Sequence, residues 1–217
     1  MRTLIPWWRN RLCIASFVAF SVRGAVAGDG SDAAGASHVF FLERFAADEV
    51  RGQCGFGQES VRTPFGVWSA PAYVNTDSRP GGCVQSFAIV DPDGALAGWS
   101  LILDFEAYGP EKVCDNTGPR KVPLAYSAAS VVWTRSYRID TDERNGGCTL
   151  GFTIDGRSDV AFDVEVRADG VPEQCPDQGE FSAWTGHPIT IRLKTDDRMG
   201  GCYLRFRLSK RNFMPLR

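Results

Sequence analysis

Residues 76–83 read Thr-Asp-Ser-Arg-Pro-Gly-Gly-Cys, and the pattern returns at residues 141–148 and 195–202. Four residues after the cysteine of each copy stands a phenylalanine: Phe87, Phe152 and Phe206. The shared signature T-D-x-R-x-G-G-C-x-x-x-F indicates three copies of one supersecondary unit. The copies are unevenly spaced, since 65 residues separate the first two signature cysteines and 54 separate the last two.

The sequence around each signature is typical of β-strands. In the third copy, apolar and polar residues alternate along 162–166, 189–193 and 202–208, and this period of two marks half-buried antiparallel strands. We expect the first strand of each copy at 39–45, 100–107 and 160–167. No convincing helical stretch of ten or more residues follows the first 27 residues.

Turn chemistry predicts how these strands connect. Paired glycines accept positive φ, and the signature Asp can accept backbone N–H bonds, so we expect a hairpin centred on each R-x-G-G turn. Asp91-Pro92-Asp93-Gly94 and Asp155-Gly156 lie at the joints between copies, and Asp-Gly is a strong hairpin signal. The last strand of one copy is therefore expected to pair with the first strand of the next.

These features predict an all-β fold in a single domain, residues 38–217, made of three pseudo-repeats of disulfide-stapled β-hairpins. The repeats span about 38–92, 93–157 and 158–210. A β unit of about 50–60 residues is hard to stabilise alone, which favours one shared domain of β-trefoil or β-prism-like type. The uneven spacing leaves a β-sandwich as the alternative.

The N-terminus has the pattern of a secretory signal. Arg2, Arg9 and Arg11 precede an apolar run over 12–22, and residues 25–27 form an A-x-A site that predicts cleavage after Ala27. The apolar run has eleven residues, short of the roughly 20 that a membrane-spanning helix needs. We expect a signal peptide over 1–27, a disordered lead over 28–37, no membrane span, and a secreted or periplasmic protein.

The cysteines predict disulfides. Cys13 lies in the signal, and six others remain, two in each repeat; an even number in an exported chain favours a disulfide framework. Their placement favours the pairs 54–83, 114–148 and 175–202, although six cysteines permit 15 pairings. No C-x-x-C pair exists and only two histidines are present, so no metal site is expected. The six are Cys54, Cys83, Cys114, Cys148, Cys175 and Cys202.

Each repeat also offers candidate ligand-binding residues. One tryptophan precedes each signature Asp, by nine, nine and twelve residues; it could fill the core or serve as a stacking platform for a sugar ring. The signature Asp and Arg could form a purely structural turn or bind hydroxyls, carboxylates or sulfates. The candidates are Trp68, Trp133, Trp184, Asp77, Arg79, Asp142, Arg144, Asp196 and Arg198.

Enzymatic interpretations find little support. The sequence has no G-x-S-x-G elbow and no phosphate-binding glycine loop, and no spacing singles out a carboxylate pair among Glu43, Asp104, Glu106 and Glu180. A calcium site built on Asp140 and Asp142 is not shared, since the counterparts of Asp140 are Asn75 and Lys194. We expect no catalytic activity and no cofactor.

The chain after residue 27 carries 20 basic and 26 acidic residues, which argues against nucleic acid as a partner. Three cysteine-stapled β repeats resemble three-lobed lectins in architecture, although no lectin motif matches residue by residue. The sequence therefore favours a secreted, non-enzymatic carbohydrate-binding (lectin-like) protein with up to three related sites. The alternative is a structural or protein-interaction protein of the cell envelope or extracellular space.

Overall fold

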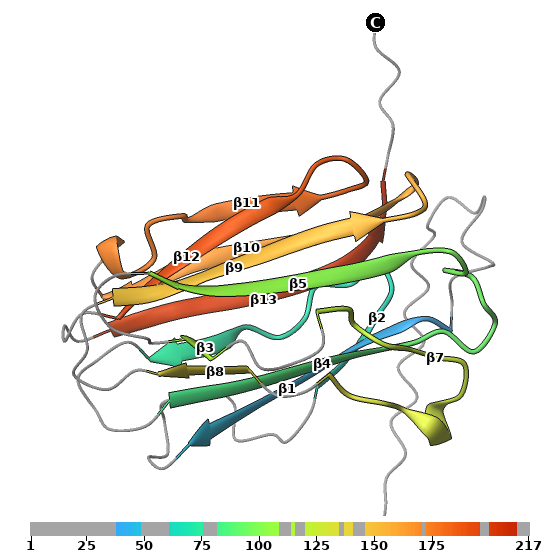
Figure 1. The fold of residues 1–217 in the computed structure, drawn as a ribbon, viewed down its shortest axis with the longest axis horizontal. Coiled ribbons are helices and arrows are strands. Elements are labelled where there is room, and N and C mark those ends of the chain that lie inside the picture. The colour runs from blue at the N-terminus through green and yellow to red at the C-terminus, as the bar shows by residue number, and fades with distance from the viewer. Residues whose placement is uncertain are drawn as a thin grey trace, which may run out of the picture. The chain divides into compact units, whose positions relative to one another are not determined.

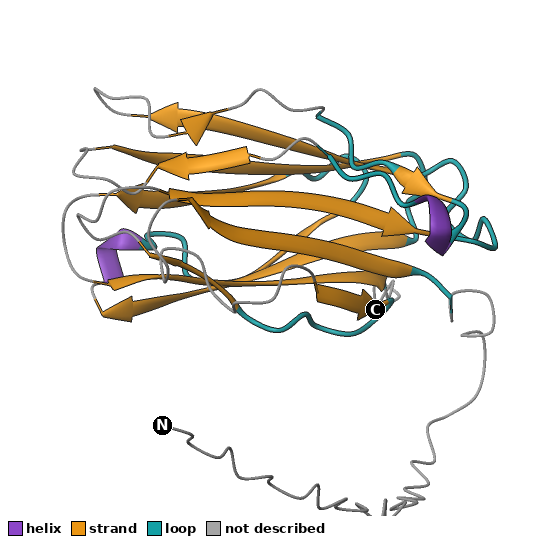
Figure 2. Cartoon of the chain, turned by 90° about the horizontal axis from the view of Figure 1, so that it is seen from below, coloured by secondary structure: helices purple, strands orange, loops and turns teal. Residues whose placement is uncertain are grey.

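The computed structural model describes residues 38–48, 61–75, 82–108, 114–115, 120–134, 137–140, 146–170, 172–195 and 200–211. These residues belong to one compact unit, Asp32–Arg217. They are all-β, as predicted: strands dominate, and the helical elements in these ranges are the short 3₁₀ turns η2 (Ala128–Ser130) and η3 (Pro172–Gln174) (Figure 2). No helix in these ranges has the length and apolarity needed to cross a membrane.

The strands form three sheets (Figure 1). The first sheet contains β1 (Phe40–Asp48), β2 (Val61–Pro64), β4 (Gly82–Val90), β6 (Cys114–Asp115), β7 (Leu124–Ala125) and β8 (Tyr137–Asp140). The second contains β5 (Ser100–Tyr108), β9 (Gly146–Asp155) and β12 (Ile189–Thr195). The third contains β3 (Ala72–Asn75), β10 (Val160–Gly170), β11 (Gly179–Ala183) and β13 (Gly200–Lys210).

Each sheet is built around two long antiparallel strands from one of the three predicted repeats. These pairs are β1 with β4, β5 with β9 and β10 with β13, and their first strands begin within one residue of the predicted positions. An alanine lies opposite the signature cysteine in every pair, and the three matches are Ala47 with Cys83, Ala107 with Cys148 and Ala168 with Cys202.

The predicted hairpins around the signature turns are wrong. The strand before each signature pairs with the signature strand of a different repeat: β3 with β13, β8 with β4, and β12 with β9. The register is the same in all three sheets, with Val74, Ile139 and Leu193 opposite Cys202, Cys83 and Cys148. Alternation reveals which face of a strand is buried but not which strand is its partner, so the exchange was not visible in the sequence.

The predicted pairing across the joints between repeats is also wrong, since β4 and β5 lie in different sheets, as do β9 and β10. At the first joint, both carboxylate oxygens of Asp91 accept backbone N–H bonds, from Ala95 and Leu96, each at 2.8 Å. At the second joint, Gly156 has φ 103° and lies against the backbone of Gly98. A Cβ added to Gly156 would lie 1.9 Å from the carbonyl oxygen of Gly98. The two joints therefore pack against each other instead of forming in-sheet hairpins.

The signature phenylalanines meet in the core. The ring of Phe206 lies 5.7 Å from that of Phe87 and 6.1 Å from that of Phe152, measured between centroids. All three rings are buried and belong to one hydrophobic cluster, to which all three sheets contribute residues. Phe41 and Phe162 join this group through centroid distances of 6.2 and 5.8 Å to Phe206. The shared spacing from cysteine to phenylalanine thus places one large ring from each sheet in the same cluster.

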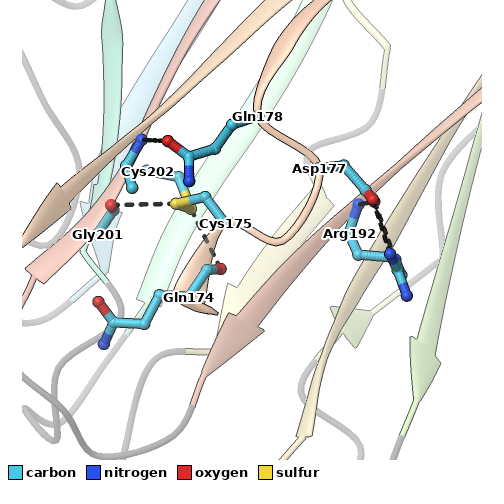
Figure 3. The surroundings of a disulfide bond; sticks show 8 residues. Gln174, Cys175, Asp177, Gln178, Arg192, Gly201 and Cys202 are labelled. Atoms are coloured by element: carbon cyan, nitrogen blue, oxygen red, sulfur yellow. Dashed lines mark hydrogen bonds and ion pairs between the residues drawn. A yellow bond between two sulfur atoms is a disulfide. The ribbon is translucent and has the colours of Figure 1, made fainter. Parts of the chain in front are cut away.

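One of the three favoured disulfides lies entirely within the described residues and is confirmed. Cys175, directly after η3, bonds to Cys202 of β13 with a Cα–Cα distance of 5.8 Å (Figure 3). Cys83 and Cys148 are disulfide-bonded as well. Their predicted partners stay untested, because Cys54 and the side chain of Cys114 lie outside the described residues.

Removing this bridge should measurably weaken the fold. The bond links residues 27 apart, for which chain-entropy arguments predict about 3–4 kcal/mol of stabilisation. Urea unfolding of the Cys175→Ala/Cys202→Ala double variant, compared with the wild type under non-reducing conditions, should show a loss of that size. A difference below about 0.5 kcal/mol would contradict the role assigned to the bridge.

Candidate functional site

The outer face of the third sheet carries an unusual concentration of charge. On β10 and β13 the apolar side chains face the core, and the intervening positions face the opposite side of the sheet. Antiparallel register brings these outer positions together across the two strands. The outer residues are Asp163, Glu165 and Arg167 on β10, and Tyr203, Arg205 and Arg207 on β13.

Glu165 is one centre of this network. Its side chain is largely buried, and its carboxylate accepts hydrogen bonds from two arginines. Arg167 donates through Nε at 2.7 Å, and Arg205 donates through Nη1 at 3.0 Å. The two guanidinium groups are thus held in place by one carboxylate, an arrangement that charge assistance strengthens.

Asp163, on the same face of β10, is the second centre. It is 4% exposed and accepts hydrogen bonds from Arg207 Nε and Ser209 Oγ, both at 2.8 Å, and from the hydroxyl of Ser182 on β11. Both buried carboxylates therefore have charged partners, as burial of a charge requires.

A shallow hollow lies beside this network. It is lined by Pro71, Glu165, Arg167, Tyr203 and Arg205 and has a volume of about 220 Å³. Tyr203 is 37% exposed, and its other contacts include the Tyr73 ring of β3 at 4.8 Å between centroids. The hollow combines an accessible aromatic ring with guanidinium groups fixed in position.

The residues of the hollow are not repeated on the other sheets. At the register positions where the third sheet has Glu165 opposite Arg205, the first sheet has Arg44 opposite Ser86. The second sheet has Asp104 opposite Gly151 there. The hollow is therefore a feature of the third sheet and not of the shared repeat.

The predicted signature residues are not placed by this structure. Asp77, Arg79, Asp142, Arg144, Asp196 and Arg198 all lie outside the described residues.

The three predicted tryptophans are half-buried and lie beneath arginines. Arg207 stacks on Trp68 at 4.3 Å from the ring centroid, Arg44 on Trp133 at 4.5 Å and Arg211 on Trp184 at 4.5 Å. Such cation–π contacts contribute about 0.5–2 kcal/mol each. Each indole thus has a guanidinium over one face of its ring.

The residue after two of these tryptophans fastens one repeat to another. Ser69 Oγ accepts the Phe206 N–H at 3.0 Å while the Ser69 N–H donates to the Phe206 carbonyl at 2.8 Å. Thr134 forms the same pair of bonds with Phe87, at 3.0 and 2.9 Å. We refer to these as the Ser69 clasp and the Thr134 clasp. Thr185, which follows Trp184, differs: its hydroxyl donates to the carbonyl of Arg157 at 2.7 Å. Trp184 also stands three residues further from its signature Asp than the other two tryptophans do.

Sequence reasoning missed the residues that line the hollow. Alternation along β10 and β13 already placed Glu165, Tyr203 and Arg205 on the polar faces of two strands. Only the pairing of these strands, which the sequence did not reveal, brings Glu165 opposite Arg205. Opposite charges directly across a strand pair would have been the available signal.

Glu43 on β1 is the unexpected core residue. It is 1% exposed, and it faces inward between Phe41 and Phe45. Desolvation by burial raises the pKa of its carboxyl to about 8, a shift that a hydrogen bond with the Ser69 side chain partly offsets. The carboxyl is therefore largely protonated at neutral pH, which is how buried acids avoid an uncompensated charge.

Within the described ranges, no three His, Cys, Asp or Glu side chains gather in a way that could hold a metal ion. Comparisons with family models, curated proteins and solved structures found no match to this chain.

Glu43 should make stability depend on pH. Its pKa is about 8 in the folded protein against an ordinary value of 4.5, so the folded state keeps a proton that the unfolded chain releases between these values. The stabilisation is complete below pH about 4.5 and is lost as pH rises through 8, at up to about 1.4 kcal/mol per pH unit.

Urea unfolding at about pH 5, 6, 7 and 8 of the wild type and the Glu43→Gln variant measures this effect. The stability of the wild type should fall relative to the variant as pH rises, by a few kcal/mol in total. Parallel pH profiles for the two proteins would show that Glu43 does not retain its proton on folding.

Proposed function

We propose that this chain is an exported, non-enzymatic binding protein whose ligand is carbohydrate, and that the hollow on the third sheet is its principal site. The observation that carries the proposal is the exposed Tyr203 ring beside Arg167 and Arg205, both bonded to the buried Glu165. Export rests on the signal-like pattern of residues 1–27.

The chemistry of the hollow suits a sugar ring. An aromatic ring offers an apolar surface for the C–H face of a pyranose, while guanidinium groups donate to its oxygens. The bonds of Arg205 to Glu165 and to the Ser69 carbonyl use two of its five N–H groups. Because these arginines are already ordered, ligand binding would cost little side-chain entropy.

The size of the hollow favours a small binding unit. Its volume of about 220 Å³ lies below the roughly 300–1,000 Å³ of pockets that enclose drug-sized ligands. We therefore infer recognition of a single sugar residue within a larger glycan, whose remainder stays in solvent.

For the architecture, we propose a β-prism-like domain of three pseudo-repeats. Three sheets centred on equivalent strand pairs, and three exchanged strands in one register, support this proposal. The signature turns remain candidates for additional, related sites, which would make binding multivalent.

The alternative is a structural or protein-interaction role. Its support comes from the Ser69 and Thr134 clasps, which give the Trp-Ser and Trp-Thr pairs a purely structural purpose. Tyr126 and Val132, each 61% exposed, offer apolar surface for a protein partner.

A glycan array probed with the oxidised protein tests the carbohydrate proposal. The Tyr203→Ala variant removes the stacking ring and should lower the apparent affinity for any bound glycan at least tenfold. A tenfold change corresponds to a loss of about 1.4 kcal/mol of binding free energy. Tyr126→Ala is the matched control, because it makes the same change at an exposed tyrosine after β7. A blank array, or equal binding by wild type and Tyr203→Ala, would remove the proposal.

A further inference from the structure

The lining of the hollow sets one carboxylate against two arginines. Both oxygens of Glu165 are engaged: Oε1 accepts from Nε and Nη2 of Arg167, and Oε2 accepts from Nη1 of Arg205 at 3.0 Å. A guanidinium is always charged in proteins. On the same face of the sheet, by contrast, the carboxylate of Asp163 bonds to a single arginine, Arg207. The lining therefore keeps one positive charge that no carboxylate of the lining balances.

Two further acidic residues share this face of the sheet but do not bond to the arginines of the hollow. Asp169 lies two residues beyond Arg167 on β10, and Glu180 of β11 lies opposite Glu165, on the side of β10 away from β13. Both are exposed, and no hydrogen bond or ion pair within the described residues joins either of them to Arg167 or Arg205. Because solvent and salt screen exposed charges, these two carboxylates do not replace a bonded counter-ion.

Each arginine of the hollow also has N–H groups that the fold leaves unused. Arg167 uses Nε and Nη2 for Glu165, and Arg205 uses Nε for the Ser69 carbonyl and Nη1 for Glu165. A guanidinium has five N–H groups, so with two used, three remain on each arginine without a partner among the described residues. The Arg167 side chain is 69% exposed, so a ligand can reach these donors.

The register of β10 and β13 places these donors next to the exposed ring. Tyr203 lies directly opposite Arg167 across the strand pair and two residues from Arg205 along its own strand. Opposite residues of an antiparallel pair have Cβ atoms about 4.5–5.5 Å apart, and alternate residues of one strand face the same side. A sugar stacked on Tyr203 would therefore hold an acidic substituent within reach of a guanidinium.

We propose that the hollow recognises an acidic sugar, whose ring stacks on Tyr203 and whose carboxylate or sulfate ester bonds to Arg167 and Arg205. One negative charge on the ligand balances the positive charge left in the lining, while Glu165 holds both guanidinium groups in place. Bonds from a guanidinium to an anionic oxygen are roughly twice as strong as neutral hydrogen bonds, and a neutral sugar cannot form them. This inference names the ligand class of the hollow and rests on the proposed carbohydrate function.

The charge of the whole chain makes this preference a local one. The chain after residue 27 is acidic overall, so its long-range field does not attract an anionic ligand. The preference for acidic sugars must therefore arise from direct contact with Arg167 and Arg205, and removing one of these contacts should remove most of it.

An array of matched sugars tests the ligand class with the wild-type protein alone. Each pair holds one glycan with and without its charge: oligogalacturonate and its methyl ester, sialyllactose and its methyl ester, and sulfated and unsulfated lactose. The wild type should bind the acidic member of the carboxylate or the sulfate pairs at least about tenfold more tightly, and the pair that responds identifies the acidic group. Equal binding of both members, lost in Tyr203→Ala, would overturn the acidic class and leave the carbohydrate proposal standing. A blank array would overturn both.

The Arg167→Gln variant tests the residue that carries the preference. It removes the charge and the donor fork but keeps Tyr203, so binding of the acidic sugars should fall at least about tenfold, towards that of their uncharged partners. Arg120→Gln is the matched control, because Arg120 is 67% exposed and bonds to a carboxylate of the second sheet, Asp104. It should bind as the wild type does. If Arg167→Gln still preferred the acidic sugars as strongly as the wild type, or if Arg120→Gln lost the preference equally, the hollow would not be the acidic-sugar site.

Discussion

Each signature strand is hydrogen-bonded on one side to the first strand of its own predicted repeat and on the other to a short strand of a different one. This exchange makes every sheet depend on two repeats. It also explains why a repeat of about 50–60 residues need not be stable alone: its apolar face is completed by its neighbours, and Phe87, Phe152 and Phe206 pack in one core. The clasps at Ser69 and Thr134 fasten the exchanged segments once more.

The same exchange helps to build the hollow on the third sheet. Because β3 of the first repeat is added to β13 of the third, the segment 65–71 lies beside Arg205 and contributes Pro71 to the hollow. A site assembled in this way contains residues from two repeats. Its charged residues all come from the third repeat, and the matching places on the other sheets hold Ser86 and Gly151 where the third sheet has Arg205.

The sequence predicted the local features well and the pairing poorly. Alternation along β10, β12 and β13 revealed the strands and their buried faces, and the cysteine positions pointed to the bond between Cys175 and Cys202. Which strands pair with each other depends on contacts between residues distant in sequence. Glu165 and Arg205 were therefore recognised as polar positions but not as neighbours across a strand pair. Glu43 was more accessible to inference: it stands between Phe41 and Phe45 at the spacing of inward-facing residues, and a carboxyl there already signals an unusual core position.

Nuclear Overhauser contacts between backbone protons would reveal whether the strands are exchanged between the repeats. With exchanged strands, we expect cross-strand contacts between Tyr73 and Tyr203, between Cys83 and Ile139, and between Cys148 and Leu193. Contacts that instead joined the strands on the two sides of a single signature turn, such as 72–75 with 82–86, would show simple hairpins and rule out strand exchange.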